Sequence, residues 1–238
     1  MQYLALLGGD ESLDPAQGSP EWDALLVDYR RFGTLAADAI VAGEALQPTA
    51  TAATVRHGDG APLVIDGPYA ETSEAIGGFY VLEAATLDDA IELAKEIPAA
   101  ATGWVGLRPM EGWYPAEGDP EVTGVRYMAI MYGKESAADT PGTPEWEASA
   151  AEHGRFVSEA GPAVLGGVAL HPVDTTTTVR VRDGEVLVTD GPYAESAEVA
   201  GGAYLIQAAD RDEALALAGR IPVNAGGAVE VRPIWVTH

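Results

Sequence analysis

The sequence predicts an α+β protein made of two tandem ferredoxin-like βαββαβ repeats that pack as a pseudo-symmetric α/β barrel. The first observation is an internal repeat: Asp66-Gly67-Pro68-Tyr69 returns as Asp190-Gly191-Pro192-Tyr193, and this offset of 124 residues aligns the two halves without a gap. The second is the order of strand-like and helix-like segments in each copy, which is that of the ferredoxin-like unit. The third is that helices on one face of such a sheet leave the other face bare, and an identical sheet is the usual cover.

Each copy opens with a strand followed by a helix. Residues 3–7 and 127–131 form short apolar runs that are typical of strands. Ser19-Pro20, like Thr143-Pro144, places a capping hydroxyl before a proline that suits the first helical position. Apolar residues then recur at three- and four-residue spacing, which predicts a helix with one buried stripe that ends near Gly43 and, in the second copy, near Gly167.

A hairpin, a strand, a second helix and a last strand complete each copy. Asp59-Gly60 separates two short β-branched runs, which predicts a hairpin, and residues 78–82 predict the next strand. Thr86 begins a second helix with the spacing of a capping box, Pro98 stops it, and residues 105–108 predict the last strand. The second copy repeats these signals at Asp183-Gly184, 202–206, Asp210, Pro222 and 229–232.

The repeat divides the 238 residues into a first domain over residues 1–110, a linker over 111–124 that is rich in Gly, Pro and acids, and a second domain over 125–238. Each domain is long enough to bury a core of its own. The apolar content of 47% with 21% charged residues is that of a globular protein. No apolar run approaches the roughly 18 residues of a membrane span, so we expect no membrane contact.

Composition narrows the function classes further. A net charge of −24 repels phosphate backbones, and only 13 Lys and Arg are present, so we expect no direct nucleic-acid binding. The absence of cysteine excludes disulfides and thiolate chemistry. Because the first residues lack the basic start and the length of a signal sequence, we expect a cytoplasmic protein. No two histidines have metal-ligand spacing, and we expect neither a metal nor a cofactor.

The motifs carry a family resemblance over nearly the whole chain. Asp-Gly-Pro-Tyr-Ala-Glu is followed in both halves by Gly-Gly-x-Tyr, and later by Ile-Pro and by Val-x-x-Arg-Pro. This string resembles the YCII-related family, in the branch named for its Asp-Gly-Pro-Phe motif, with Tyr69 and Tyr193 in place of the phenylalanine. The resemblance implies the dimeric α/β-barrel fold, fused here in tandem. It also implies two alternatives for function: cofactor-free enzymes with a catalytic His-Asp pair, or an association with extracytoplasmic-function sigma factors.

Asp66 and Asp190 are the first candidate catalytic residues. A carboxylate at a strand end beside a Gly-Pro turn can be held partly desolvated, which raises its pKa and suits it to proton abstraction. The alternative is that Asp-Gly-Pro only builds a turn, in which Asp bonds its own backbone, Gly supplies a positive φ and Pro fixes φ. The residues alone favour the turn.

His153 is the candidate partner of these acids. It lies on the first helix of the second copy, and Tyr29 occupies the corresponding position in the first copy, so only one half could use it. If an acid-base pair exists, His153 with Asp190 is the expected one. The alternative is a histidine that is packed or solvated on a helix face.

Arginine recurs at three positions in this acidic chain. Arg31, Arg56 and Arg108 return at the repeat offset as Arg155, Arg180 and Arg232. Arg56 and Arg180, with Tyr69 and Tyr193 of the motif, are the candidate substrate-binding residues, because a guanidinium can hold an anionic substrate or stabilise an enolate. The alternative is an internal ion pair, for example from Arg56 to Asp66 or Glu71.

Two function classes therefore remain open from the sequence. The first is an enzyme of isomerase or lyase type that binds a small-molecule ligand and moves a proton with the Asp/His pair. The second is a non-enzymatic ligand sensor or regulatory partner of a sigma factor, for which the acidic surface could dock a basic protein. Because the fused repeats already supply both halves of the fold, a monomer suffices, and a homodimer remains the alternative.

Overall fold

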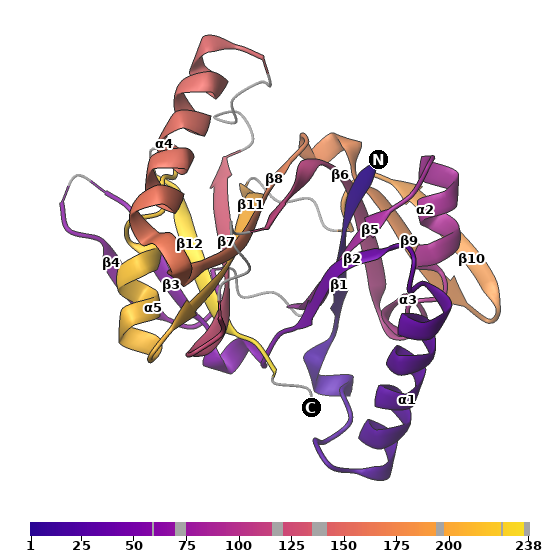
Figure 1. Cartoon of the computed structure of the whole chain (residues 1–238). Helices are drawn as coiled ribbons and strands as arrows, with labels where there is room; N and C mark the ends of the chain where they lie inside the picture. Colours follow the sequence, from indigo (N-terminus) through magenta and orange to yellow (C-terminus); the bar gives the residue numbers. More distant parts are fainter. Residues whose placement is uncertain are drawn as a thin grey trace. The chain divides into compact units, whose positions relative to one another are not determined.

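The computed structural model describes residues 1–58, 60–69, 75–115, 121–134, 142–193, 198–224 and 226–235. The chain divides into two compact units, each containing segments of both repeats. Unit 1 comprises Met1–Leu46, Thr72–Glu111 and Val173–Glu195, and unit 2 comprises Gln47–Glu71, Gly112–Pro172 and Ser196–His238. The described residues form antiparallel strands and five α-helices, which confirms the α+β class (Figure 1).

The sheet of unit 1 has six strands in an all-antiparallel arrangement. In spatial order they are β2 (Ile40–Ala45), β5 (Ala75–Glu83), β1 (Gln2–Gly9), β6 (Trp104–Pro115), β9 (Thr177–Arg182) and β10 (Glu185–Asp190). The first four have the strand order of a ferredoxin-like unit. The helices of the first repeat are α1 (Pro20–Leu35), α2 (Leu87–Ala94) and α3 (Pro98–Thr102).

The sheet of unit 2 repeats this order with the equivalent strands. They are β8 (Val164–Leu170), β11 (Glu198–Ala208), β7 (Val125–Lys134), β12 (Ala228–Pro233), β3 (Ala53–Arg56) and β4 (Leu63–Asp66). Its helices are α4 (Pro144–Ala160) and α5 (Arg211–Ala218). Short 3-10 turns lie at Glu11–Leu13, Thr49–Thr51, Gly161–Ala163 and Val173–Thr175.

The two repeats exchange their hairpins. Hairpin β3–β4 of the first repeat pairs with β12 of the second, with Val55 opposite Val229, and lies beside it in Figure 1. Hairpin β9–β10 of the second repeat pairs with β6 of the first in the same register, with Val179 opposite Val105. Unit 1 therefore contains the Asp-Gly-Pro-Tyr segment of the second repeat, and unit 2 contains that of the first repeat.

The structure confirms the predicted helix starts and corrects the predicted ends. Ser19 and Thr143 accept hydrogen bonds from the Trp22 and Trp146 N–H groups, and a proline occupies the first turn in both cases. The helices end at Leu35 and Ala160, so the prediction that they run to near Gly43 and Gly167 was wrong. These two glycines lie instead in strands β2 and β8, which the sequence analysis did not predict.

Aromatic packing explains why those strands contain glycine. Gly43 lies opposite Tyr80 in the sheet, and a Cβ on Gly43 would come within 2.4 Å of the Tyr80 ring. Gly167 has the same relation to Tyr204, at 2.8 Å. Each glycine leaves space for the ring of the tyrosine that lies opposite it on the adjacent strand. These glycines therefore indicate close packing in the sheet and not the end of a helix.

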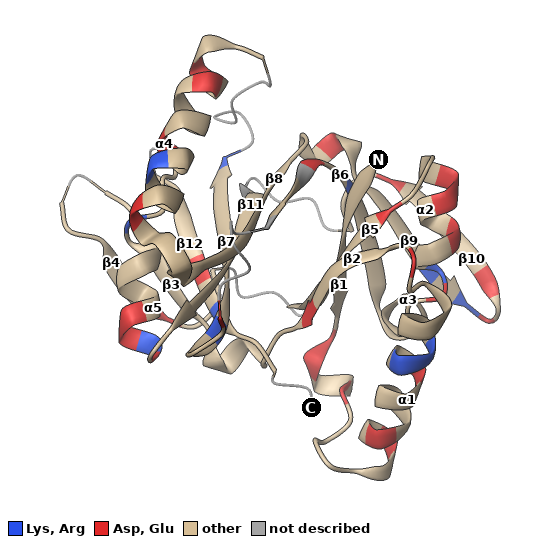
Figure 2. Ribbon diagram, viewed as in Figure 1, with Lys and Arg blue, Asp and Glu red and all other residues tan. Residues whose placement is uncertain are grey.

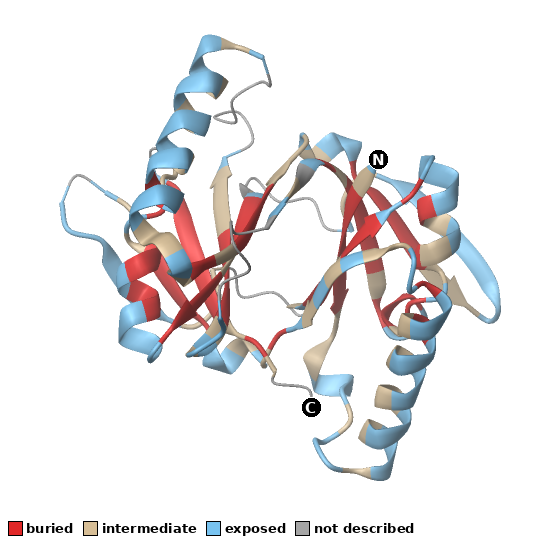
Figure 3. Ribbon diagram, viewed as in Figure 1, coloured by how far each residue is buried: buried red, intermediate tan, exposed pale blue. Residues whose placement is uncertain are grey.

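Each unit has one hydrophobic core between its sheet and its helices. In unit 1 the core includes Phe32 of α1, Leu82 of β5 and Val179 of the exchanged hairpin. In unit 2 it includes Phe156, Ile206 and Val55. Figure 3 shows the buried residues concentrated on the strands and on the inner sides of the helices. The exchanged hairpins therefore contribute residues to both cores. Burying a valine side chain, such as that of Val55 or Val179, contributes about 1.5–3 kcal/mol to stability.

Charge lies outside these cores. Figure 2 shows acidic residues on the helices and near strand ends, and most of the acidic residues of the described part are exposed. Among the described residues, no helix is both long and apolar enough to cross a membrane. Strand β6 continues to Pro115, so the first part of the segment 111–124, which was expected to be a linker, is strand, and residues 116–120 lie outside the described part.

Candidate functional site

The motif tyrosine of unit 2 is part of a stack of rings and a guanidinium. The Tyr69 ring stacks on the Tyr132 ring of β7, with centroids 4.6 Å apart and planes at 11°. The guanidinium carbon of Arg56, on β3, lies 5.0 Å from the centroid of the Tyr69 ring, which is a cation–π contact. Two predicted substrate-binding residues, Arg56 and Tyr69, are therefore in contact, and Tyr132 joins them.

Unit 1 contains the same stack built with a different third residue. Arg180 lies 5.4 Å from the centroid of the Tyr193 ring, and Tyr193 stacks on Trp104 of β6 at 5.4 Å and 7°. Trp104 and Gly8 face each other across β6 and β1, as Ala228 and Tyr132 do across β12 and β7. In unit 1 the large aromatic side chain of this residue pair is on β6, and in unit 2 it is on β7, the equivalent of β1. In both units this side chain stacks on the motif tyrosine.

The Asp-Gly-Pro turn fixes the position of each motif tyrosine. Gly67 and Gly191 have φ of 103° and 91°, a region in which glycine is favoured. The Gly67 N–H donates to the Ala52 carbonyl at 2.9 Å, and the Thr54 hydroxyl donates to the Gly67 carbonyl at 3.0 Å. Thr178 makes the same contact to Gly191 at 2.8 Å. The turn role expected for this motif is therefore present in both units.

The candidate acids Asp66 and Asp190 lie on the surface. Both are exposed, and the side chain of Asp66 is 86% exposed. Asp66 forms an ion pair with Arg211 of α5 rather than the alternative pair with Arg56. Glu71, the other expected partner of Arg56, lies outside the described residues. The partial desolvation that would suit these carboxylates to proton abstraction is absent, because strands β4 and β10 are at the edges of their described sheets.

His153 packs between helix α4 and the sheet of unit 2. Its Nδ1 lies 2.9 Å from the Tyr204 hydroxyl. Burial lowers the pKa of His153, an effect that the Glu152 charge partly opposes, and burial raises the pKa of Tyr204 to about 12. His153 belongs to unit 2 and Asp190 to unit 1, so neither unit contains both members of the expected acid-base pair.

The first repeat shows that this histidine position is a packing position. Tyr29 and Tyr80 occupy the places of His153 and Tyr204, and burial raises the pKa of both tyrosines. The neighbouring phenylalanines are arranged alike: Phe32 contacts Tyr80 at 5.1 Å and 62°, and Phe156 contacts Tyr204 at 5.2 Å and 61°. A tyrosine therefore fulfils in unit 1 the role that His153 has in unit 2.

A buried ion pair next to the stack of unit 2 was not predicted from the sequence. The side chains of Glu230 and Arg232 on β12 are 2% and 3% exposed and form an ion pair. The second carboxylate oxygen of Glu230 accepts a hydrogen bond from the Tyr69 N–H at 2.9 Å. Burial, followed by the nearby Glu230 charge, raises the pKa of Tyr132. The available signal was a glutamate inside an apolar strand, two residues before a recurring arginine.

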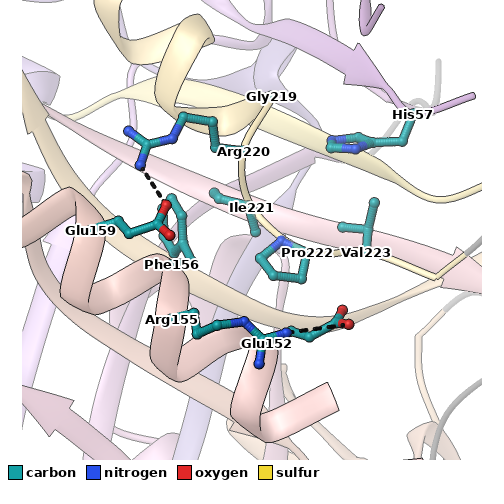
Figure 4. A pocket seen from close by; sticks show the side chains of 10 residues that line it. All are labelled: His57, Glu152, Arg155, Phe156, Glu159, Gly219, Arg220, Ile221, Pro222 and Val223. Carbon is teal, nitrogen blue, oxygen red and sulfur yellow. Dashed lines mark hydrogen bonds and ion pairs between the residues drawn. The ribbon is translucent and has the colours of Figure 1, made fainter. Parts of the chain in front are cut away.

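Two grooves of the described surface are lined by residues other than those of the stacks. The groove of unit 2 has a volume of about 370 Å³ and lies between α4 and the segment after α5 (Figure 4). A groove of about 310 Å³ occupies the equivalent place beside α1 in unit 1. Figure 4 shows Arg220 paired with Glu159 and Arg155 paired with Glu152 along the larger groove. The Ile-Pro pairs of the motif string line both grooves, but no residue of the Asp-Gly-Pro-Tyr segments does, and we place the candidate site at the stacks that contain those segments.

No group of three or more His, Asp or Glu side chains in the described residues is arranged to hold a metal ion.

Comparison with known protein families fits the two-copy organisation. The model of the YCII-related domain matches residues 13–114 and again residues 125–238. The chain belongs to the YCII-related family. A relative, the uncharacterized protein R00369 of Rhizobium meliloti (strain 1021), is 36% identical to this chain over 121 residues. That match covers 98% of the relative and 49% of this chain, so the relative has about the length of one repeat.

Proposed function

We propose that this YCII-related protein binds a small organic anion with a planar or apolar body at its two arginine–tyrosine–aromatic stacks. The observation that carries the proposal is that both units have the stack although its third ring comes from different strands, Trp104 of β6 in one and Tyr132 of β7 in the other. The arrangement has been kept while the residue that completes it has changed. If Trp104 or Tyr132 served only to pack its own strand, there would be no reason for a ring to stack on the motif tyrosine in both units.

The chemistry of the stack suits such a ligand. A guanidinium is planar, always charged and able to bind a carboxylate through two hydrogen bonds, while the rings pack against a planar or apolar body. The net charge of −24 repels anions at long range, so an anion must be held by local contacts. For an enzyme, Arg56 or Arg180 would stabilise negative charge developing during a cofactor-free isomerisation or elimination, and Asp66, Asp190 or His153 would move the proton.

The test is a calorimetric titration of the full chain with benzoate and with acetate. The double variant R56A/R180A should lose benzoate binding. The double variant R31A/R155A is the matched control, because it removes the same charge from arginines that line the grooves. Equal loss in the two variants would indicate unspecific electrostatics and would refute the proposal, as would a wild-type chain that binds neither anion.

The proposed fold includes closure of the two units into the α/β barrel. In each sheet the strand residues alternate, so that Tyr3 and Tyr127 enter the cores while Leu4 and Met128 lie on the helix-free faces. An apolar sheet face needs a cover, and the helix-free face of the other unit would supply it. Small-angle X-ray scattering on the monomer tests this, since separated units would give a larger radius of gyration than a closed barrel.

A second candidate function is docking of a regulatory protein such as an extracytoplasmic-function sigma factor. The observation that favours it is the exposed apolar character of edge strands β4 and β10, which carry the exposed residues Leu63, Val64, Ile65, Val186, Leu187 and Val188. An exposed edge strand can accept a strand from a partner. Co-purification with a sigma factor encoded beside the gene tests this function, and loss of the complex in V64K and L187K variants should accompany it.

A further inference from the structure

Strand β10 is an open edge of the unit 1 sheet. It pairs with β9 on one side, and no other described strand pairs with it. All six of its residues are exposed. Three of them in succession, Val186, Leu187 and Val188, are apolar, with exposures of 42%, 39% and 48%. Because successive residues of a strand point to opposite faces, β10 is apolar on both faces.

The hydrophobic core of unit 1 ends at the strand beside this edge. Val186 and Val188 lie opposite Val181 and Val179 of β9, and opposite residues of a strand pair share a face of the sheet. Val179 is fully buried in the core, whereas Val188 remains exposed. Strand β10 therefore continues the sheet beyond the part that the helices cover (Figure 1).

The equivalent edge of unit 2 is protected against a further strand. Strand β4 has four residues instead of six, and Pro62 precedes it at the position equivalent to Val186. Proline has no N–H to donate, and edge strands of natural proteins use it to prevent pairing. At the other end of β4, Asp66 forms an ion pair with Arg211 of α5, whereas the equivalent Asp190 forms none with any described residue. The chain therefore has one blocked edge and one open edge.

The apolar residues of the open edge are complementary to a second copy of the same strand. In an antiparallel pair centred on Leu187, this leucine lies opposite Leu187 of the second copy, and Val186 lies opposite Val188. The four valines then share one face of the joined sheet, and the two leucines share the other. Each copy thus covers the apolar side chains that the other exposes.

The charged residues of β10 allow this register and oppose its neighbour. With Leu187 at the centre, Glu185 lies opposite Thr189, and Asp190 lies opposite Gly184. No two acids face each other. A shift of the centre to the point between residues 187 and 188 would place Glu185 opposite Asp190, and like charges directly opposite are destabilising. The sequence of the strand therefore selects the register centred on Leu187.

We propose that two copies of this chain associate by antiparallel pairing of their β10 strands, centred on Leu187, so that their two unit 1 sheets become one continuous sheet. This inference is independent of anion binding at the stacks. It names a second copy of the chain, and not a regulatory protein, as the occupant of the β10 edge.

Net charge and the length of the strand set the conditions for this dimer. Each chain has a net charge of −24, so two copies repel each other at long range. A six-residue strand is about 20 Å long, and a contact of this length belongs to the small interfaces below roughly 1,200 Å². We therefore expect a reversible dimer. It should tighten as the salt concentration rises from about 0.05 to about 0.5 M, because salt screens the repulsion between exposed charges.

Sedimentation equilibrium of the full chain over a range of concentrations tests the dimer. The mass of the wild type should rise from that of one chain to that of two, at lower chain concentration in the higher salt. The variant L187K places a charge at the centre of the pair, and V186P copies Pro62 of the blocked edge, so both should remain monomeric. The variant L63K is the matched control, because it makes the same change at the equivalent position of β4, and it should dimerise like the wild type.

A single introduced cysteine tests the register. The chain contains no cysteine of its own. Opposite Cα atoms of an antiparallel pair are about 4.5–5.5 Å apart, a separation that a disulfide can span. The variant L187C should therefore form an interchain disulfide on mild oxidation, seen on a non-reducing gel. The variant L63C should not, although Leu63 is 60% exposed and Leu187 only 39%.

Several results would overturn the inference. One is a wild-type chain that stays monomeric in both salt concentrations. Another is a dimer that L187K leaves intact, or that L63K weakens as much as L187K does. Equal disulfide formation in L187C and L63C would show random collision instead of pairing. If V186P does not fold, which circular dichroism shows, L187K and L187C still decide the question, because both change an exposed side chain and leave the backbone hydrogen bonds in place.

Discussion

Replacing Glu230 by alanine should destabilise unit 2 strongly. The substitution leaves the Arg232 guanidinium, whose side chain is 3% exposed, without its buried counter-charge. Removing one partner of a buried ion pair costs about 3–5 kcal/mol. The Tyr69 N–H loses its acceptor as well, which adds about 1 kcal/mol. We therefore expect a loss of at least about 3 kcal/mol in the free energy of unfolding, a large part of the roughly 5–15 kcal/mol that stabilises a typical protein.

Urea unfolding followed by far-ultraviolet circular dichroism measures this loss. The companion variants are R232M and E230A/R232M, which complete a double-mutant cycle. The double variant should be much closer to the wild type than either single variant, because apolar side chains can replace a buried ion pair at little cost. An E230A variant within about 1 kcal/mol of the wild type would refute the reasoning, since the pair would then not be shielded from water.

Three further predictions concern residues outside this pair. Because burial lowers the pKa of His153, the unfolded state takes up its proton first as the pH falls below about 6.5, and the free energy of unfolding should decrease from there downward. The variant H153Y, which copies Tyr29, should fold and show a shallower decrease in urea titrations between pH 7.5 and 5; a decrease as steep as in the wild type would contradict the assignment. The variant R182A removes four hydrogen bonds from Arg182 to carbonyl groups, three of them at the end of α3, and should lower the free energy of unfolding by about 2 kcal/mol, with R182K only partly restoring it. The variant D66N breaks only an exposed ion pair with Arg211 and should cost less than about 1 kcal/mol; a larger loss on thermal unfolding would show that Asp66 has a role beyond this contact.

Local signals in the sequence were sufficient to predict those helix starts and turns whose structure depends only on residues a few positions apart. The capping hydroxyls of Ser19 and Thr143 and the capping box at Thr86 mark helix starts that the structure confirms. The turns at Asp183-Gly184 and at the Asp-Gly-Pro motifs behave likewise, since backbone conformation and side-chain bonds over a few residues decide them. Strands β2 and β8 were missed because their glycines are explained by the Tyr80 and Tyr204 rings, which are distant in the sequence.

The candidate site was only partly visible for the same reason. The recurrence of Arg56 and Arg180 beside the motif tyrosines pointed to two residues that do lie together. Glu230 gave no comparable signal, because it does not recur, and its importance comes from the Tyr69 N–H that an exchanged hairpin brings to it. The sequence left open whether His153 is an acid-base residue or a packed one, and only the structure shows its contact with the Tyr204 hydroxyl.

The sequence by itself determined that this protein is a doubled YCII-related domain, because a repeat at a constant offset and the local signals of each element can be read without coordinates. Only the tertiary structure decided which copy each hairpin joins. The strands that receive the hairpins carry equivalent residues, Val105 and Val229, so pairing within a repeat or across repeats would form the same backbone hydrogen bonds. That choice is made by packing between distant segments, and it brings the Glu230 carboxylate to the N–H of one motif tyrosine, Tyr69.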